Sequence, residues 1–146
     1  IIEFKDVLAR ALGGRIAEKI VYGEERVTTG AGSDLRHATE IAREMVVEQG
    51  MGKKLRDQVF HEDNGGMMFD RMTHERPYGD DTAKEIDKEI ADLIKEAAKR
   101  AEIVITNNRT SLDKLADALL DQETLEEEQV AQILEGAILP KEAKLY

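Results

Sequence analysis

Cysteine and tryptophan are absent from this 146-residue sequence, and proline occurs only twice. Without cysteine the chain has neither a disulfide framework nor a thiolate zinc site. Few prolines leave long stretches free to form helices, and the abundant Ala, Leu, Ile, Glu, Lys and Arg residues favour them. No apolar run reaches the ~18–20 residues that cross a bilayer. These absences predict a helical protein without a spanning segment in this stretch.

The sequence also lacks an excess of positive charge. Its formal net charge is −10, and its Lys and Arg residues alternate with acids instead of forming clusters. An acidic surface repels a phosphate backbone, so nucleic acid is not an expected partner. Hydrophobic residues make up 41% of the chain and fall into periodic blocks. That content suffices for one core, and we expect a single domain over residues 1–146.

Apolar residues recur at helical spacing in five segments. The first segment, 5–22, contains Gly13-Gly14, which predicts either close approach of another backbone or a break. We interpret this glycine pair as serving packing rather than binding. The remaining segments are about 34–49, a long one from near residue 82 to Asn107-Asn108, about 110–121, and one that starts near residue 124 and ends at Gly136. Capping boxes are predicted for the third and fifth segments, at Thr82 with Glu85 and at Thr124 with Glu127.

The predicted fold class is therefore mainly α, an antiparallel helical bundle-like lobe. The segment around 56–79 interrupts the helical pattern and is predicted to be irregular or a β-hairpin. Within it, Val59-Phe60 and Met67-Met68-Phe69 are either short strands or loop anchors.

Few side chains are candidates for a catalytic or metal-binding role on their local pattern alone. Asp34 follows Gly32-Ser33 at an expected helix start, where an acidic residue ordinarily accepts backbone hydrogen bonds and suits the helix dipole. His37 lies three residues further on and shares a helix face with Asp34, which allows a metal pair, although an isolated surface histidine is the better interpretation. His61 and His74 receive no role.

Three stretches, in this order and at this spacing, resemble the C-terminal part of the peptidase domain of FtsH-type ATP-dependent zinc metalloproteases. The first is ALGGRIAEKIVYGE at 11–24. The second is VTTGAGSDL at 27–35, followed by ATEIAR at 38–43. The third is DTAKEIDKEI at 81–90, continuing to the leucine pair at 119–120 and to ETL at 123–125. The resemblance covers most of the chain and is weakest at 56–79.

The resemblance implies a large assembly. Such proteins combine membrane anchors, an AAA+ ATPase module that binds ATP and Mg²⁺, and a zinc peptidase domain, and they work as hexamers on unfolded or membrane proteins. The peptidase domain lies in a soluble compartment, on the cytoplasmic side in bacteria or in an organelle, and this piece alone is expected to be soluble. The zinc is held by the two histidines of an HExxH helix and by a later aspartate, whose counterpart here is Asp34.

Other positions acquire candidate roles from the same resemblance. Glu18 is a candidate for orienting a zinc ligand, with a solvated helix carboxylate as an equally good alternative. Thr28, Thr29 and Gly30 are candidates for shaping the substrate cleft, with a plain turn as the competing interpretation. None of these residues is expected to be catalytic itself.

The sequence departs from the family pattern in one respect. It contains neither HExxH nor a G-x-x-x-x-G-K-[ST] phosphate loop. Because the family carries these parts upstream, and because the chain begins at Ile1 without an initiating Met, truncation is the expected cause rather than natural loss. This chain alone is therefore predicted to be inactive and to supply one zinc ligand of three. The alternative is a non-catalytic helical assembly or adaptor module.

Overall fold

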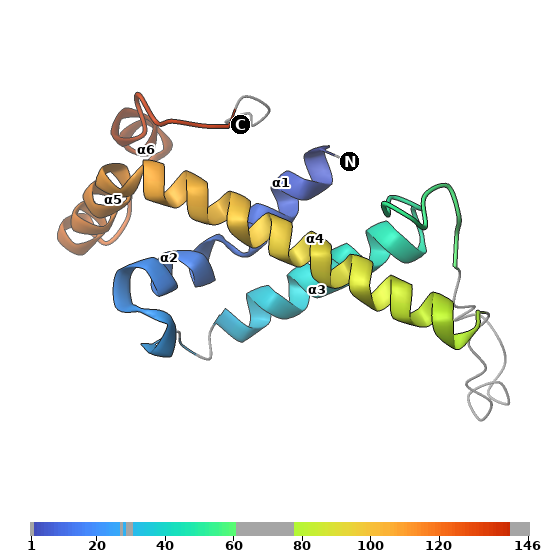
Figure 1. Ribbon diagram of the computed structural model, residues 1–146. Helices are drawn as coiled ribbons and strands as arrows, with labels where there is room; N and C mark the ends of the chain where they lie inside the picture. Colours follow the sequence, from blue (N-terminus) through green and yellow to red (C-terminus); the bar gives the residue numbers. More distant parts are fainter. Residues whose placement is uncertain (1, 27, 29–30, 61–77, 141–146) are drawn as a thin grey trace, which may run out of the picture.

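The structure, a computed structural model, describes residues 2–26, 28, 31–60 and 78–140, and these residues form helices joined by loops (Figure 1). No strand occurs among them, which confirms the mainly α class. The elements are α1 (Ile2–Ala11), α2 (Gly13–Tyr22), the 3₁₀ turn η1 (Glu24–Arg26), α3 (Ala31–Val47), α4 (Asp80–Asn107), α5 (Arg109–Gln122) and α6 (Glu127–Ile133).

The glycine pair marks a break in the first predicted helix. Helix α1 ends at Ala11, and α2 begins at Gly13. The N–H of Leu12 still donates to the carbonyl of Leu8 at 3.2 Å, and the N–H of Ile16 donates to that of Leu12 at 3.0 Å. The two helices therefore keep a common apolar stripe across the break.

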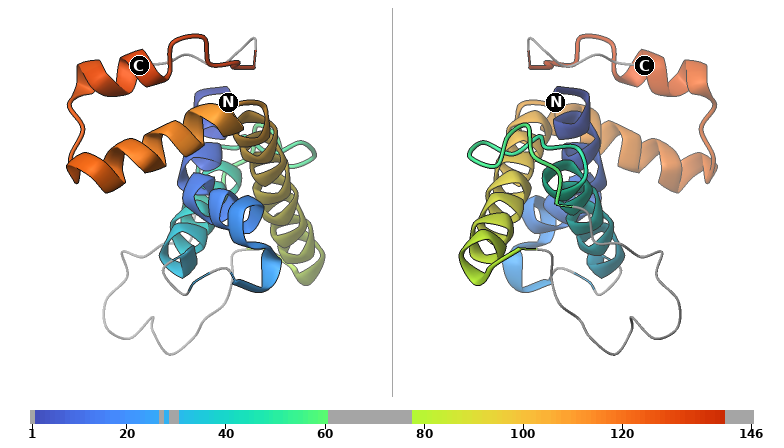
Figure 2. Two further views of the ribbon diagram at one scale, coloured as in Figure 1. Left: turned by 90° about the vertical axis from the view of Figure 1, so that its left-hand side faces the viewer. Right: turned by 90° about the vertical axis from the view of Figure 1, so that its right-hand side faces the viewer.

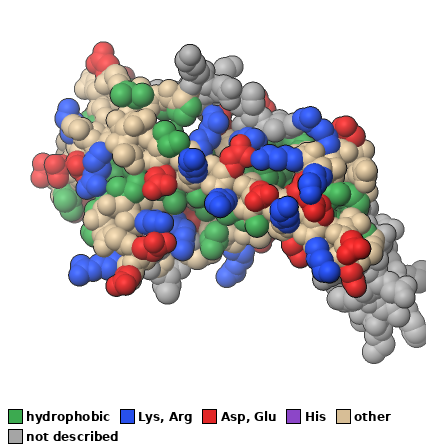
Figure 3. All heavy atoms as spheres, in the orientation of Figure 1, with side chains coloured by type: hydrophobic (Ala, Val, Ile, Leu, Met, Phe, Trp, Pro, Cys, Tyr) green, Lys and Arg blue, Asp and Glu red, His purple; other side chains and the backbone are tan. Residues whose placement is uncertain are grey.

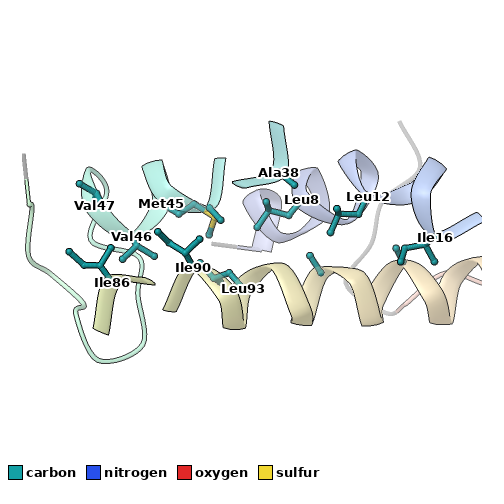
Figure 4. Close-up of a cluster of buried hydrophobic side chains, with 13 residues drawn as sticks. Leu8, Leu12, Ile16, Ala38, Met45, Val46, Val47, Ile86, Ile90 and Leu93 are labelled. Carbon is teal, nitrogen blue, oxygen red and sulfur yellow. The ribbon is translucent and has the colours of Figure 1, made fainter. Parts of the chain in front are cut away.

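The core lies between α4 and the first three helices. Helix α4 contacts α1, α2 and α3, and the predicted long stripe is its buried face. Figure 4 shows one face of α4 packed against the C-terminal half of α3 near Ile86 and Ile90, and against Leu8, Leu12 and Ile16 further along the helix. Helix α3 crosses α4 obliquely (Figure 1), and its C-terminal end lies near the N-terminal part of α4 (Figure 4). The buried cluster comprises Leu8, Leu12, Ile16, Ala38, Ala42, Met45, Val46, Val47, Ile86, Ile90, Leu93, Ala97 and Ala101.

Residues 50–60, which we call the strap, leave the end of α3 and fold back onto it. Gly50 has φ +58°, and its carbonyl accepts from the N–H of Asp57 at 3.0 Å. The N–H of Phe60 donates to the carbonyl of Val47 at 2.7 Å, and the Phe60 ring meets Tyr78 edge-on at 5.7 Å. Val59-Phe60 is therefore a loop anchor and not a strand. Met67-Met68-Phe69, His61 and His74 lie outside the described residues.

Acidic side chains of α4 hold the strap. The buried carboxylate of Glu89 accepts the N–H groups of Lys53, Lys54 and Leu55, at 2.8, 2.5 and 3.3 Å. Glu85 pairs with the Lys54 Nζ at 3.0 Å. The predicted Thr82–Glu85 capping box is therefore wrong, because α4 already begins at Asp80 and the Glu85 carboxylate is engaged by the strap.

Helices α5 and α6 form an arm that projects from the four-helix body (Figure 2). Neither helix contains a buried residue. Glu126 is the N-cap of α6, and its N–H donates to the Gln129 Oε1 at 2.8 Å, so the capping box predicted at Thr124 and Glu127 lies two residues too early. The Asn108 side chain joins the arm to α4 by bonding the backbone N–H and carbonyl of Ile138, at 2.6 and 2.7 Å.

The surface carries charges of both signs. Over α4, Lys and Arg side chains alternate with Asp and Glu, and no single sign dominates this face (Figure 3). Of the helices in the described part of the chain, none has the length and apolarity that a membrane span requires.

Candidate zinc-ligand site

Helix α2 packs into the core with one face and approaches Thr28 and Asp34 with another. Ile16 is buried in the core, and Ile20 packs against it, so this face fixes α2 on the body. Gly14 and Glu18 lie one helical turn apart and therefore share another face. Glu18 contacts Thr28, which precedes α3, whereas Gly14 lies close to Asp34 in the first turn of α3. The core thus sets the position of the surface that receives Thr28 and Asp34.

Glu18 anchors Thr28. Its Oε2 accepts the Thr28 N–H at 2.9 Å, and its two oxygens lie 3.2 and 3.1 Å from the Thr28 hydroxyl. A carboxylate that accepts a backbone N–H and a hydroxyl together fixes both the position and the rotation of that residue. The structure thus places Glu18 in contact with the threonine-glycine segment rather than free in solvent. Thr29 and Gly30 lie outside the described residues.

Asp34 lies in the first turn of α3, which begins at Ala31. It is therefore the fourth helical residue and not the N-cap that its local pattern suggests. Asp34 is one turn before the buried Ala38 and shares its face, so its side chain is only half-buried at the edge of the core. No hydrogen bond or ion pair joins its carboxylate to another described residue. Its oxygens remain available as acceptors for an external cation.

Gly14 lies directly beneath that carboxylate. A Cβ added to Gly14 would be 3.3 Å from the Asp34 Oδ2, whereas a Cβ added to Gly13 would meet nothing within 4 Å. Sequence reasoning treated the two glycines as one packing feature and missed this difference. The sequence offered one signal for this difference: Gly14, unlike Gly13, lies one helical turn before the acidic Glu18 and shares its face.

The histidine and acidic residues that the structure describes do not complete a metal site. His37 is exposed on α3. Among the residues that the structure describes, no group of three or more His, Asp or Glu side chains is arranged to hold a metal. Because zinc needs three or four ligands from N, O or S donors, Asp34 fits as one ligand and requires partners beyond the described set.

A comparison with the sequence profiles of known protein families matches residues 2–133 to peptidase family M41. This match covers most of the chain, and the chain belongs to that family. The FtsH-type peptidase domain indicated by the three sequence stretches is thereby confirmed.

Curated relatives agree with the family. The chain is 43% identical over 133 residues to the ATP-dependent zinc metalloprotease FtsH of Chloroflexus aggregans, covering 90% of this chain and 20% of that protein. The FtsH protein of Bacillus subtilis is 43% identical over 141 residues, with 95% and 22% covered. That of Haemophilus influenzae is 36% identical over 133 residues, with 90% and 21% covered. The chain spans about a fifth of the length of these relatives.

Proposed function

We propose that this chain works as part of an ATP-dependent zinc metalloendopeptidase that degrades unfolded or membrane proteins. Its contribution is the third zinc ligand, Asp34, on a helical scaffold. The observation that carries the proposal is the half-buried Asp34 carboxylate, which bonds no other described residue. Thr28, six residues earlier in the sequence, is hydrogen-bonded to Glu18. Membership of peptidase family M41 supplies the reaction class.

In this proposal Asp34 binds the metal and Glu18 orients the chain near it. Asp34 offers carboxylate oxygens, which are normal zinc ligands at about 2.0–2.2 Å. Glu18 holds Thr28, six residues before Asp34, and so limits the orientations available to the connecting segment. In metal sites, groups that orient a ligand typically change metal affinity by about 10–100-fold.

The remaining chemistry lies outside this sequence. Zinc, when bound, activates a water molecule and polarises the scissile carbonyl. Two further ligands and a general base are required, and the sequence has no HExxH to provide them. In the proposal, ATP and Mg²⁺ bind a separate ATPase module, and segments outside this chain anchor the protein in a membrane with its peptidase part on the cytoplasmic side or in an organelle.

A direct experiment compares this chain with a protein that also includes the residues encoded before Ile1. Cleavage of an unfolded protein such as casein is measured with and without a zinc chelator. We expect chelator-sensitive cleavage by the longer protein only, because the 146-residue chain carries one ligand of the set. Chelator-sensitive cleavage by the pure 146-residue chain would contradict the proposed division of ligands. Failure of the longer protein to cleave would favour the non-catalytic helical module.

The α5–α6 arm is the proposed contact between copies in a hexamer. Leu120 is 82% exposed and Leu119 46% exposed, although both lie on a helix with several apolar side chains. A helical hairpin without a buried residue gains little stability alone and is a natural surface for assembly. Replacing Leu119 and Leu120 by Lys should therefore lower the oligomeric state of the longer protein in analytical ultracentrifugation. An unchanged hexamer would remove the arm from the interface.

A further inference from the structure

We infer that Gly14 is a positioning residue for the Asp34 carboxylate: the missing side chain at position 14 leaves the space in which the ligand oxygen lies. For its functional meaning the inference rests on the proposed zinc role of Asp34. Its geometric part stands on the structure alone and is tested separately.

The contact is specific to one of two adjacent glycines. A Cβ on Gly14 would lie 3.3 Å from the Asp34 Oδ2, a separation tighter than ordinary van der Waals contact. The same atom on Gly13 would meet open space. Gly14 is also exposed, and the Asp34 Oδ2 is the one neighbouring atom of another described helix that a Cβ at position 14 would meet within 4 Å.

Backbone conformation does not explain the glycine at position 14. Gly14 is the second residue of α2 and is not among the described residues with positive φ. At a helical position alanine is favoured over glycine. A glycine here therefore works against helix formation, and the feature that it protects is the approach of the Asp34 carboxylate to the surface of α2.

An added methyl group would move the ligand. At 3.3 Å the neighbour must give way by a few tenths of an ångström. Metal–ligand distances in protein sites ordinarily lie within roughly ±0.2 Å of their usual values. We therefore expect a displacement of this size to weaken metal binding while leaving the helices intact.

The geometric part is tested by a double-mutant cycle in the 146-residue chain. Gly14→Ala and its matched control Gly13→Ala are each made in the wild-type and in an Asp34→Ala background, and urea unfolding is followed by circular dichroism. In the wild-type background we expect Gly14→Ala to have a urea midpoint roughly 0.3 M below that of Gly13→Ala. With Asp34→Ala the two midpoints should coincide. A difference that persists without Asp34, or that is absent in both backgrounds, would overturn the inference.

The functional part is tested by zinc titration of the longer protein that includes the residues encoded before Ile1. We expect Gly14→Ala to raise the zinc dissociation constant about tenfold, and Gly13→Ala to leave it unchanged. Asp34→Ala is the reference for loss of the ligand. If Asp34→Ala weakens zinc binding but Gly14→Ala does not, the inference about Gly14 fails and the zinc role of Asp34 survives. If Asp34→Ala leaves zinc binding intact, the proposed ligand role itself fails.

Discussion

At the scale of single residues, Glu89 shows how a buried charge can organise a loop. Its side chain enters the core region, and the structure supplies three backbone N–H donors from the strap around its two oxygens. Hydrogen bonds to a charged acceptor are among the stronger ones in proteins. Gly52 makes the arrangement possible, because a Cβ at that position would overlap the Glu89 Oε2.

Replacing Glu89 by Gln should lower the free energy of unfolding by about 1–3 kcal/mol, because the amide nitrogen would face a backbone N–H that then lacks an acceptor. Urea unfolding measures the change. Glu102→Gln, on an exposed position of the same helix, is the matched control and should change stability by less than about 0.5 kcal/mol. Equal effects of the two substitutions would contradict the conclusion that Glu89 stabilises the strap.

Asp34→Ala should leave the fold nearly unchanged. The carboxylate bonds no other described residue, so its loss removes only a favourable charge in the first turn of α3, worth typically about 0.3–1 kcal/mol. Thermal unfolding of the 146-residue chain provides the measurement. A larger loss would mean that Asp34 is a structural residue first and would weaken its assignment as a metal ligand.

Residue-level features were only partly predictable from the sequence. Asp34 and Glu18 were predicted as site residues through the family resemblance, and their roles stay predictions. The hydrogen bond between Glu18 and Thr28 could not be predicted from local pattern. The burial of Glu89 could not be predicted, because its position on the helical pattern of α4 is that of an ordinary acidic residue beside an apolar stripe. Its burial depends on the strap, whose path is set by long-range contacts and not by local pattern.

At the scale of elements, the strap depends on a tight turn after α3. Gly50 has φ +58°, and a Cβ there would lie 2.8 Å from the carbonyl oxygen of Gln58. A left-handed conformation is costly for residues with a side chain, and backbone oxygen has little freedom to move away. The strap therefore requires glycine at this position.

Gly50→Ala should destabilise the chain by at least about 1–2 kcal/mol. Amide hydrogen exchange should speed up at Asp57, whose N–H bonds the carbonyl of Gly50 in the turn, and at Phe60, whose N–H bonds the carbonyl of Val47 at the end of α3. Gly32→Ala is the control, since a Cβ at that helical position meets nothing within 4 Å. It should stabilise α3 or leave it unchanged. Comparable losses from both substitutions would argue against the turn as the reason for Gly50.

Helix positions followed from apolar periodicity, but their starts did not. The long helix ends at Asn107, as its apolar pattern predicted. Both predicted capping boxes were wrong, because the sequence signature of Thr followed by Glu also occurs inside helices and beside them. Glu85 was taken up by the strap, and Glu126 rather than Thr124 starts α6.

At the scale of the whole molecule, ion pairs connect α1, the strap and α4. The Lys5 ammonium donates a hydrogen bond of 2.7 Å to Glu96 and lowers the pKa of that carboxyl below its usual 4.5. A hydrogen bond from Lys54 likewise lowers the pKa of Glu85. A carboxyl group whose pKa is lower in the folded state contributes stability above its unfolded pKa and loses it as pH falls through the folded value.

The free energy of unfolding should therefore decrease as pH falls below about 4.5, where the carboxyl groups begin to bind protons in the unfolded chain. Glu96→Gln should reduce this decrease in the free energy of unfolding at acid pH, which we call the acid limb. The reason is that the substitution removes one carboxyl group whose pKa differs between the folded and unfolded states. Glu102→Gln, which removes an exposed carboxyl on the same helix, should preserve the limb. Urea unfolding measured between pH 3 and 7 tests both variants, and identical acid limbs would exclude a contribution from Glu96.

The overall architecture was predictable as mainly α, because the apolar stripe of α4 spans a long, continuous helical pattern. The separation into a four-helix body and a projecting arm was not, because α5 and α6 have the same amphipathic pattern as buried helices. Only the structure shows that none of their residues is buried. That difference is what makes the arm a candidate surface for assembly.

The proposed zinc role of Asp34 in a peptidase of family M41 is open to direct measurement. Zinc content measured by elemental analysis of the longer protein, which includes the residues encoded before Ile1, tests it most directly. We expect one zinc per chain in the wild type and in His37→Ala, because His37 is an exposed helix residue. We expect a large loss of zinc in Asp34→Ala, with the helix content preserved. Stoichiometric zinc in Asp34→Ala, or loss of zinc in His37→Ala alone, would contradict a ligand role of Asp34.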